Sequence, residues 1–400
     1  MVYYNGLATR RKTRAKGRVR TMSENQYFDA GVVGAGIIGL AHAYHLAKRG
    51  MKVAVFERNS RAGGSSIRDS GMILPIAQPS GRGRKLAQRS RDLWCEVLKE
   101  TAIKYEECGS LHLAYRQDEA QVLDEFANSL ASAGIETELL KPAQVALKSN
   151  AAQQKGLIAG LWSRSEMCFD PREAIPKLTD WLQREHGVEF FFNCAVNSYH
   201  RPVLAAGGRC WKAGSLFVCC GDAYEGLFPR LFEGVGILRT KRQLMRTTPY
   251  AENWRLGPIL TSGLTLRQSA SFAPCLSMES LKSRIASESP LFDRYGIHAV
   301  VSRNGSGELV IGESCELDAE IDPFDKVEID RLILDYLVSF LDVPSLRIAS
   351  RWHIIQLKHP KDAFSVVDAA PGATVVANLG EAGMTLAFGL AEEIVRERAL

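Results

Sequence analysis

The clearest chemical signal in the sequence is a turn of closely spaced glycines near the N-terminus. Gly34, Gly36 and Gly39 separate an apolar stretch from a segment with helical periodicity, and Glu57 lies 23 residues after Gly34. In a strand–turn–helix unit, such glycines allow a tight bend, close approach of a pyrophosphate, and close packing of helix on strand. The helix N-terminus offers free N–H groups to phosphates, and a carboxylate at position 57 can accept hydrogen bonds from ribose hydroxyls. The pattern predicts a dinucleotide site, with a glycine-rich packing turn as the alternative.

Two further loops of small residues favour FAD over NAD. Residues 61–66 read Arg-Ala-Gly-Gly-Ser-Ser, and residues 380–385 read Gly-Glu-Ala-Gly-Met-Thr. The long FAD molecule must pass close to more backbone than NAD does, and a helix that starts at the second loop can direct its N-terminus at the flavin, where negative charge develops on reduction. An NAD-dependent dehydrogenase stays open as a rival. The residues expected to contact the cofactor are Gly34, Ala35, Gly36, Ile37, Ile38, Gly39, Glu57, Arg58, Ser65, Ser66, Gly71, Met72, Val196, Cys220, Gly221, Gly380, Gly383, Met384 and Thr385.

Several stretches outside the first turn resemble the D-amino-acid oxidase (DAO) superfamily, whose relatives include glycine and sarcosine oxidases. Within it, the sequence is most similar to a subgroup associated with aminophosphonate breakdown. The resemblance runs from about residue 28 to the C-terminus. The stretches that carry it are residues 65–72, 75–79, 107–114, 241–247, 296–298, 351–353, 358–360 and 383–386.

Two positions depart from the pattern of that subgroup. The usual Arg-Asn-Phe-Gly is Arg68-Asp69-Ser70-Gly71 here, and Glu381 stands where relatives have glycine. Both changes add polarity or charge near the expected flavin ring, so the substrate can differ from that of close relatives. Sarcosine oxidases attach their flavin through a cysteine in the C-terminal part, whereas Cys315 is the last cysteine in this chain. We therefore expect a non-covalent flavin and no metal.

The resemblance implies oxidation of an amine: hydride passes from the α carbon to the flavin, the imine hydrolyses to a carbonyl, and oxygen is reduced to peroxide. The implied catalytic residues are Lys241, Gln243, His298, Arg351 and His353. Arg246, Arg351 and Lys358 could clamp a phosphonate or carboxylate, because guanidinium groups pair with two oxygens at once. Each has an ordinary alternative, a surface ion pair for the cations and a hydrogen-bonded core residue for the histidines.

The order of the strands and helices expected around these residues indicates a two-domain α/β flavoprotein. Strands are expected at 28–33, 52–56, 110–115, 188–195, 216–220 and 374–377, helices at 40–49, 84–102, 118–133, 171–186 and before residue 398, and a hairpin at 299–312. A Rossmann-type FAD domain would combine residues 26–82, 155–234 and 350–400. An antiparallel-sheet substrate domain would use residues 83–154 and 235–349, and residues 1–25 would be a disordered basic extension.

Composition and charge narrow the functional class. The chain has 400 residues, 46% hydrophobic and 24% charged, as is typical of a soluble globular protein. Seven basic residues between 10 and 20 account for more than the whole net charge of +5 and leave −2 for the rest. The body therefore gives no sign of nucleic acid or a membrane as a partner, and the nine cysteines fit reduced thiols in a cytoplasmic protein.

Some alternatives stay open at this stage. The basic segment could be a disordered arm, a targeting peptide, or an artefact if translation starts at Met22. The electron acceptor could be a quinone or carrier protein instead of oxygen, which would make the enzyme a dehydrogenase. A non-enzymatic protein that binds through its basic arm is the remaining rival. The exact amine and the oligomeric state are left open.

Overall fold

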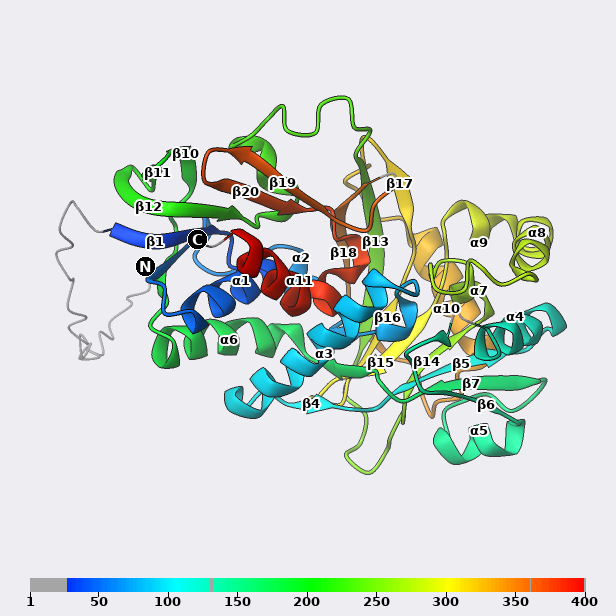
Figure 1. The fold of residues 1–400 in the computed structure, drawn as a ribbon. Helices are drawn as coiled ribbons and strands as arrows, with labels where there is room; N and C mark the ends of the chain where they lie inside the picture. The colour runs from blue at the N-terminus through cyan, green and yellow to red at the C-terminus, as the bar shows by residue number, and fades with distance from the viewer. Residues whose placement is uncertain (1–26, 130–131, 360, 399–400) are drawn as a thin grey trace, which may run out of the picture.

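The computed structural model describes residues 27–129, 132–359 and 361–398. The predicted basic extension, residues 1–25, lies outside them. Two large sheets lie next to each other, one in the half that contains α1 and α11 and one in the half that contains α4, α5 and α8 (Figure 1). None of the described helices is long and apolar enough to cross a membrane.

The first sheet has eight strands and a parallel centre. Strands β12, β1, β2 and β9 run parallel to one another, and β20 joins β12 in the same direction. Residues 30–33 of β1 and all of β2 are buried, and both segments are continuous apolar runs, as expected for parallel strands covered on both faces. The strands are β1 (Tyr27–Val33), β2 (Val53–Phe56), β9 (Glu189–Phe191), β10 (Val196–His200), β11 (Val203–Ala206), β12 (Arg209–Val218), β19 (Ser365–Ala370) and β20 (Ala373–Ala377).

Helices that are distant in sequence cover this sheet together. Helix α11 packs against both α1 and α3, and their apolar faces share one core (Figure 1). Helix α6 begins where Asp170 accepts a 2.9 Å hydrogen bond from the Arg172 amide, with Pro171 at the first position. The helices of this half are α1 (Ile37–Lys48), α2 (Ser65–Arg68), α3 (Arg82–Thr101), α6 (Pro171–Glu185) and α11 (Gly383–Arg398), with short 3₁₀ turns η1 (Pro75–Ala77), η3 (Gly221–Gly226) and η4 (Gly380–Ala382).

The second sheet has nine strands and is antiparallel except where β14 runs parallel to β5. Its strands are β5 (Ser110–Ala114), β6 (Thr137–Leu140), β7 (Ala159–Ser163), β13 (Leu238–Thr247), β14 (Ile259–Ser262), β15 (Val300–Arg303), β16 (Leu309–Gly312), β17 (Glu316–Asp318) and β18 (Ile348–Lys358). The helices of this half are α4 (Gln117–Ala127), α5 (Pro142–Lys148), α7 (Gly263–Leu266), α8 (Met278–Glu288), α9 (Pro290–Arg294) and α10 (Val327–Phe340). A small third sheet consists of β3 (Met72–Ile73), β4 (Tyr105–Glu106) and β8 (Met167–Phe169).

The predicted fold class is confirmed, and most predicted elements are present. The β1–α1–β2 unit and the β15–β16 hairpin lie where the sequence places them. Helix α4 ends at Ala127, short of the predicted residue 133, because Asn128 leaves the helical conformation and its side chain bonds back to Asp124. Strand β9 stops at Phe191, short of residue 195, where Asn193 adopts a positive φ of 52°.

Three elements lie with a different sheet from the one that the predicted domain boundaries gave them. Helix α3, predicted in the substrate domain, packs with α11 over the first sheet. Strands β7 and β18, predicted in the FAD domain, belong to the second sheet, and β18 pairs with β13 along almost its whole length. Residues 350–358 therefore share hydrogen bonds with the predicted substrate domain and contact α2 of the other half.

Candidate functional site

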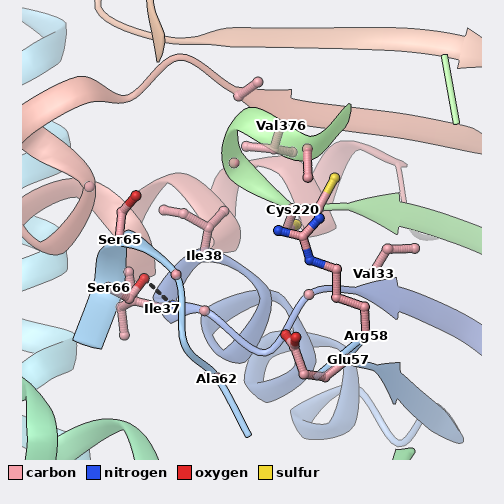
Figure 2. A pocket seen from close by; sticks show the side chains of 18 of the residues that line it. Val33, Ile37, Ile38, Glu57, Arg58, Ala62, Ser65, Ser66, Cys220 and Val376 are labelled. Atoms are coloured by element: carbon pink, nitrogen blue, oxygen red, sulfur yellow. Dashed lines mark hydrogen bonds between the residues drawn. The ribbon is translucent and has the colours of Figure 1, made fainter. Parts of the chain in front are cut away.

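A cavity of about 400 Å³ lies where the first glycine turn, the loop before α2 and the turn before α11 meet. Figure 2 shows side chains that line it, with Val376 and Cys220 on one side and Glu57 on the other. Most of the predicted cofactor residues line this cavity. They are Gly34, Gly36, Ile37, Ile38, Glu57, Arg58, Ser65, Ser66, Val196, Cys220, Gly221, Gly380, Gly383 and Met384.

The first glycine turn has the geometry of a phosphate cradle. Gly34 has a φ of 100°, and a Cβ there would lie 2.7 Å from the Cys219 carbonyl oxygen. At Gly36 a Cβ would enter the space beside Ser66, 3.0 Å from its Oγ. At Gly39 it would lie 2.0 Å from the carbonyl oxygen of Gly34, so only glycine lets α1 approach β1 this closely. A bulky side chain at any of the three would close the cradle or displace the helix.

Hydrogen bonds attach the neighbouring loops to this turn. Ile37 donates its amide to Ser66 Oγ at 3.0 Å (Figure 2), and Ala35 donates its amide to Glu57 Oε2 at 3.1 Å. Glu57 is almost fully buried and also accepts the Asn59 amide at 3.0 Å. The residues present fit FAD: Glu57 would hold the adenosine ribose, the N-terminus of α1 the pyrophosphate, and the turn before α11 the flavin.

Five predicted cofactor residues do not line the cavity and instead hold its walls: Ala35, Gly39, Gly71, Met72 and Thr385. Gly71 has a φ of 74°, and a Cβ there would meet the Phe169 carbonyl oxygen at 2.1 Å. Met72 pairs with Cys168 between β3 and β8, and Thr385 Oγ1 accepts the Leu74 amide at 3.1 Å. Their positions support the shape of the site without facing it.

A buried cluster of charged side chains lies beside the cavity, which Asp69 itself lines. Arg242 from β13 places Nη1 2.6 Å from Glu313 Oε2 and Nη2 3.7 Å from Asp69 Oδ2. His298 Nε2 lies 3.6 Å from Glu313 Oε1, and one carboxylate oxygen of Glu381 lies within 4.8 Å of these two residues. We call these five residues the charged cluster. All except Glu381 have side chains at most 9% exposed.

Burial and the neighbouring charges shift the pKa values of the residues in the cluster. Burial raises the pKa of Asp69 to about 6, although Arg242 and the Gly71 amide act in the opposite direction. Burial also opposes the charged form of Glu313, but Arg242 and His298 outweigh it and lower the pKa of Glu313. The pKa of His298 is raised: burial alone would lower it, and the hydrogen bond and negative charge of Glu313 outweigh that effect.

Replacing Asp69 with asparagine is expected to stabilise the protein at pH 7. An acid whose folded pKa lies above its unfolded pKa costs stability when it ionises, so this cost begins near the unfolded pKa of 3.8 and is complete above about pH 6. Asparagine still offers an oxygen to the Gly71 amide, which donates to Asp69 Oδ1 at 3.0 Å. A gain of about 2 kcal/mol at pH 7 that falls to a small fraction near pH 4 is expected from urea unfolding of samples with equal flavin content. Destabilisation at pH 7 would mean that the pair with Arg242 outweighs burial.

Four of the predicted catalytic residues lie on the other face of the second sheet, because alternate residues of a strand point to opposite faces. Lys241 Nζ donates to the Asp322 carbonyl at 3.0 Å and lies 3.1 Å from Asp325 Oδ1, and Gln243 donates to Asp330 at 2.9 Å. The partners of the other two are the same acids: Arg351 contacts Asp330 at 3.0 Å, and His353 contacts Asp325 at 2.8 Å. These four side chains tie β13 and β18 to residues 322–330, and none lines the cavity. These contacts are not compatible with the predicted position of the four residues beside the flavin.

Replacing Lys241 with methionine is therefore expected to lower stability and to leave the reaction with oxygen unchanged. The side chain is 1% exposed and bonds to the carbonyls of Asp322 and Phe324 and to the carboxylate of Asp325, so its loss removes three polar contacts of a buried ammonium group, at a cost of about 1–3 kcal/mol. Thermal unfolding and stopped-flow reoxidation of the reduced flavin measure the two effects separately. A large fall in the reoxidation rate without a change in stability would restore the catalytic role predicted from the sequence.

The three cations predicted to clamp an anion do not converge. Arg246 lies 3.4 Å from Glu308 and donates to Ser350 at 3.2 Å, with its guanidinium over the Trp352 ring. Arg351 faces Asp330 on the opposite side of the sheet, and Lys358 is exposed at the end of β18. Of the predicted substrate-contacting residues, the structure brings His298 alone into the charged cluster.

Four members of the charged cluster were not among the site residues predicted from the sequence: Asp69, Arg242, Glu313 and Glu381. A signal existed for two of the cluster residues: Asp69 and Glu381 both depart from the pattern of the subgroup that the chain resembles. Arg242 lies between Lys241 and Gln243, the two residues predicted to be catalytic from the stretch 241–247. Nothing in that stretch indicates whether its odd-numbered or its even-numbered residues face the cofactor. Glu313 carries no recognisable local signal.

Comparisons with known proteins agree with this geometry. The sequence model of the family described as DAO, FAD dependent oxidoreductase, matches residues 29–397. Monomeric sarcosine oxidase from Bacillus sp. (strain B-0618) is 40% identical over 80 residues, which cover 19% of this chain and 20% of that protein. The mitochondrial pyruvate dehydrogenase phosphatase regulatory subunit of Mus musculus is 34% identical over 117 residues, 29% of this chain and 13% of that protein. Both matches span far less than two thirds of the relative's length.

Solved structures share the whole fold. L-proline dehydrogenase from P. horikoshii superposes with a TM-score of 0.76 at 18% identity, covering 93% of this chain and 94% of that one. Glycine oxidase from Geobacillus kaustophilus gives a TM-score of 0.74 at 16% identity, covering 94% and 95%. Identities this low show the fold alone, whereas the family match extends over nearly the full sequence. The chain therefore belongs to the DAO family of FAD-dependent oxidoreductases.

Proposed function

We propose that the protein oxidises a small primary or secondary amine to an imine, which hydrolyses to a carbonyl compound, while oxygen is reduced to hydrogen peroxide. Two electrons and two protons leave the amine and reach oxygen, so the reaction balances. The observation that supports an amine is the charged cluster, in which three carboxylates face one arginine and one histidine beside the cofactor cavity. Relatives with this fold are named both as oxidases and as dehydrogenases of amino acids.

The residues of the cluster can bind the amine and hold its proton. FAD, when bound, supplies the acceptor for a hydride from the amine carbon. Asp69 lines the cavity and, with its pKa raised to about 6, is ionised at pH 7 and can accept a hydrogen bond or a proton from an ammonium group. Arg242 holds Asp69 and Glu313 in place, and His298 is oriented by Glu313 and by the Gly296 carbonyl, 2.9 Å from its Nδ1.

The finer substrate predictions rest on the sequence resemblance, which indicates an aminophosphonate or an amino acid. Such a substrate needs a cationic clamp, and the three predicted members, Arg246, Arg351 and Lys358, are separated in the structure. The acceptor also stays a proposal, with a quinone or carrier protein as the alternative to oxygen.

An anaerobic titration of the purified yellow protein tests the proposal. The flavin band near 450 nm is followed while butylamine, glycine, sarcosine, 2-aminoethylphosphonate and N-methyl-2-aminoethylphosphonate are added in turn. Bleaching by any of them supports amine oxidation, and peroxide release on admission of air supports an oxidase over a dehydrogenase. Bound flavin that no amine bleaches would contradict the proposal and leave the family assignment intact.

The mode of flavin attachment is checked on the same samples. Because Cys315 is the last cysteine and none follows in β18 or in the turn before α11, acid precipitation is expected to release all the flavin into the supernatant. A yellow pellet would show a covalent bond to another residue.

A further inference from the structure

The charged cluster carries more negative than positive charge. Asp69, Glu313 and Glu381 contribute three carboxylates, against the guanidinium of Arg242 and the ring of His298. Glu313 contacts both of these groups, and even if both are charged the three carboxylates leave the cluster with a net charge of −1. Asp69 is left with a single contact to Arg242, at 3.7 Å, and Glu381 makes no ion pair with any residue that the structure describes.

Arg242 is poorly placed to receive the carboxylate or phosphonate of a substrate. It is almost fully buried, and two carboxylates already surround it. A third anion would have to displace Asp69 or lie next to it, in a site where low dielectric strengthens repulsion between like charges. The cations that could have bound the anionic group of such a substrate contact other residues. Arg246 lies at Glu308, and Arg351 lies at Asp330 on the other face of the sheet.

Of the two carboxylates with spare capacity, Asp69 lines the cofactor cavity, and Glu381 stands between two residues that line it. Asp69 lines it and uses Oδ1 for the Gly71 amide, while Oδ2 accepts no hydrogen bond from the described residues. Glu381 lies in η4 between Gly380 and Gly383, which also line the cavity. An ammonium group at this edge of the cavity would find carboxylate acceptors of opposite charge, a buried one in Asp69 and an exposed one in Glu381.

We infer that this site selects a cationic amine that carries no carboxylate or phosphonate beside its reacting carbon, such as an alkylamine or a diamine, and that Asp69 and Glu381 bind its positive charge. The inference rests on the proposed amine oxidation and adds the substrate class. It differs from the anionic substrates that the sequence resemblance suggests. Glu381 is a specificity-determining residue in this view, because it adds a charge at a position where the resembling sequences have glycine.

Binding of ions that cannot be oxidised to an imine tests the inference without turnover. Flavin-loaded protein is titrated separately with tetramethylammonium chloride, sodium acetate and sodium methylphosphonate at constant ionic strength, and the shift of the flavin absorption band gives each dissociation constant. Tetramethylammonium is expected to bind more tightly than either anion. Glu381→Gln and Asp69→Asn should each weaken its binding by about tenfold, which corresponds to ~1.4 kcal/mol. The matched control Asp335→Asn, at an exposed position on α10, should leave its dissociation constant unchanged.

The outcomes separate the inference from the proposed function. Tighter binding of acetate or methylphosphonate than of tetramethylammonium would overturn the inference, and so would variants at 69 and 381 that bind tetramethylammonium as the parent does. Glu381→Gly is expected to move the preference towards anions, because it removes one of the carboxylates that repel them. In the bleaching assay, reduction by butylamine but not by glycine or 2-aminoethylphosphonate agrees with the inference. Failure of every amine to bleach the flavin would contradict the proposed function, whatever the ion titrations give.

Discussion

Valine at position 36 is expected to give a folded protein that carries no FAD. Gly36 has extended backbone angles, φ −73° and ψ 173°, which valine adopts without strain. The protein atoms nearest to a Cβ there belong to the Ser66 side chain, at 3.0 and 3.9 Å, and this side chain can rotate away. The added methyl groups would instead occupy the space at the N-terminus of α1 that the pyrophosphate needs, so the affinity for FAD should fall by at least about 100-fold, or ~3 kcal/mol.

The ratio of absorbance at 450 nm to that at 280 nm measures bound flavin, and circular dichroism checks folding. Gly305→Val is a matched control, because Gly305 lies exposed in the β15–β16 turn outside the cavity, where a Cβ would lie 3.1 Å from the Lys104 side chain, nearly as close as the Gly36 Cβ lies to Ser66. The control should retain full flavin. A folded Gly36→Val protein with stoichiometric FAD would contradict the assignment of this turn to the pyrophosphate.

Replacing Arg242 with methionine is expected to destabilise the protein by about 3 kcal/mol at pH 7. The change leaves Glu313 and Asp69 buried without their arginine, and buried charges that lose a partner are costly. The destabilisation caused by the replacement should become smaller as the pH falls. In the parent, the lowered pKa of Glu313 gives stability that is present above its unfolded pKa, about 4.3, and lost below it. In the variant, the carboxyls escape the cost of burial by taking up protons.

Urea unfolding at pH 7 and near pH 4 measures both parts of this expectation. Arg351→Met is the matched control: its side chain is 50% exposed and pairs with Asp330 at 3.0 Å, so the loss should be at most about 1 kcal/mol. Equal destabilisation by the two changes, or a loss at position 242 that does not depend on pH, would show that the charged cluster is not a buried ion network.

The local parts of the cofactor site follow directly from consecutive residues. Gly34 and Gly39 are required by a positive φ and by a close helix–strand contact, so their spacing in the sequence identifies the turn. The apolar runs of β1 and β2 and the helical periodicity between them are equally local. FAD could be expected for the same reason, since three of the segments that line the cavity are glycine-rich loops that the sequence shows directly.

The side of β13 that faces the cofactor could not be predicted in this way. Residues 240–245 of this strand are all buried, so polar and apolar positions do not alternate as they do in a half-exposed strand. Lys241 and Gln243 therefore looked equivalent to Arg242, although a shift of one residue moves a side chain to the opposite face of the sheet.

The sequence by itself thus determined the family, the fold class, the FAD turn and two unusual acids, Asp69 and Glu381. The tertiary structure decided how they are used. It brings Asp69, Arg242, His298, Glu313 and Glu381 together from five separate segments, and it directs Lys241, Gln243, Arg351 and His353 to acids on the other face of the sheet. The reason is physical: turn geometry and strand hydrophobicity depend on neighbouring residues, whereas the charge balance of a site depends on which distant side chains share one low-dielectric space.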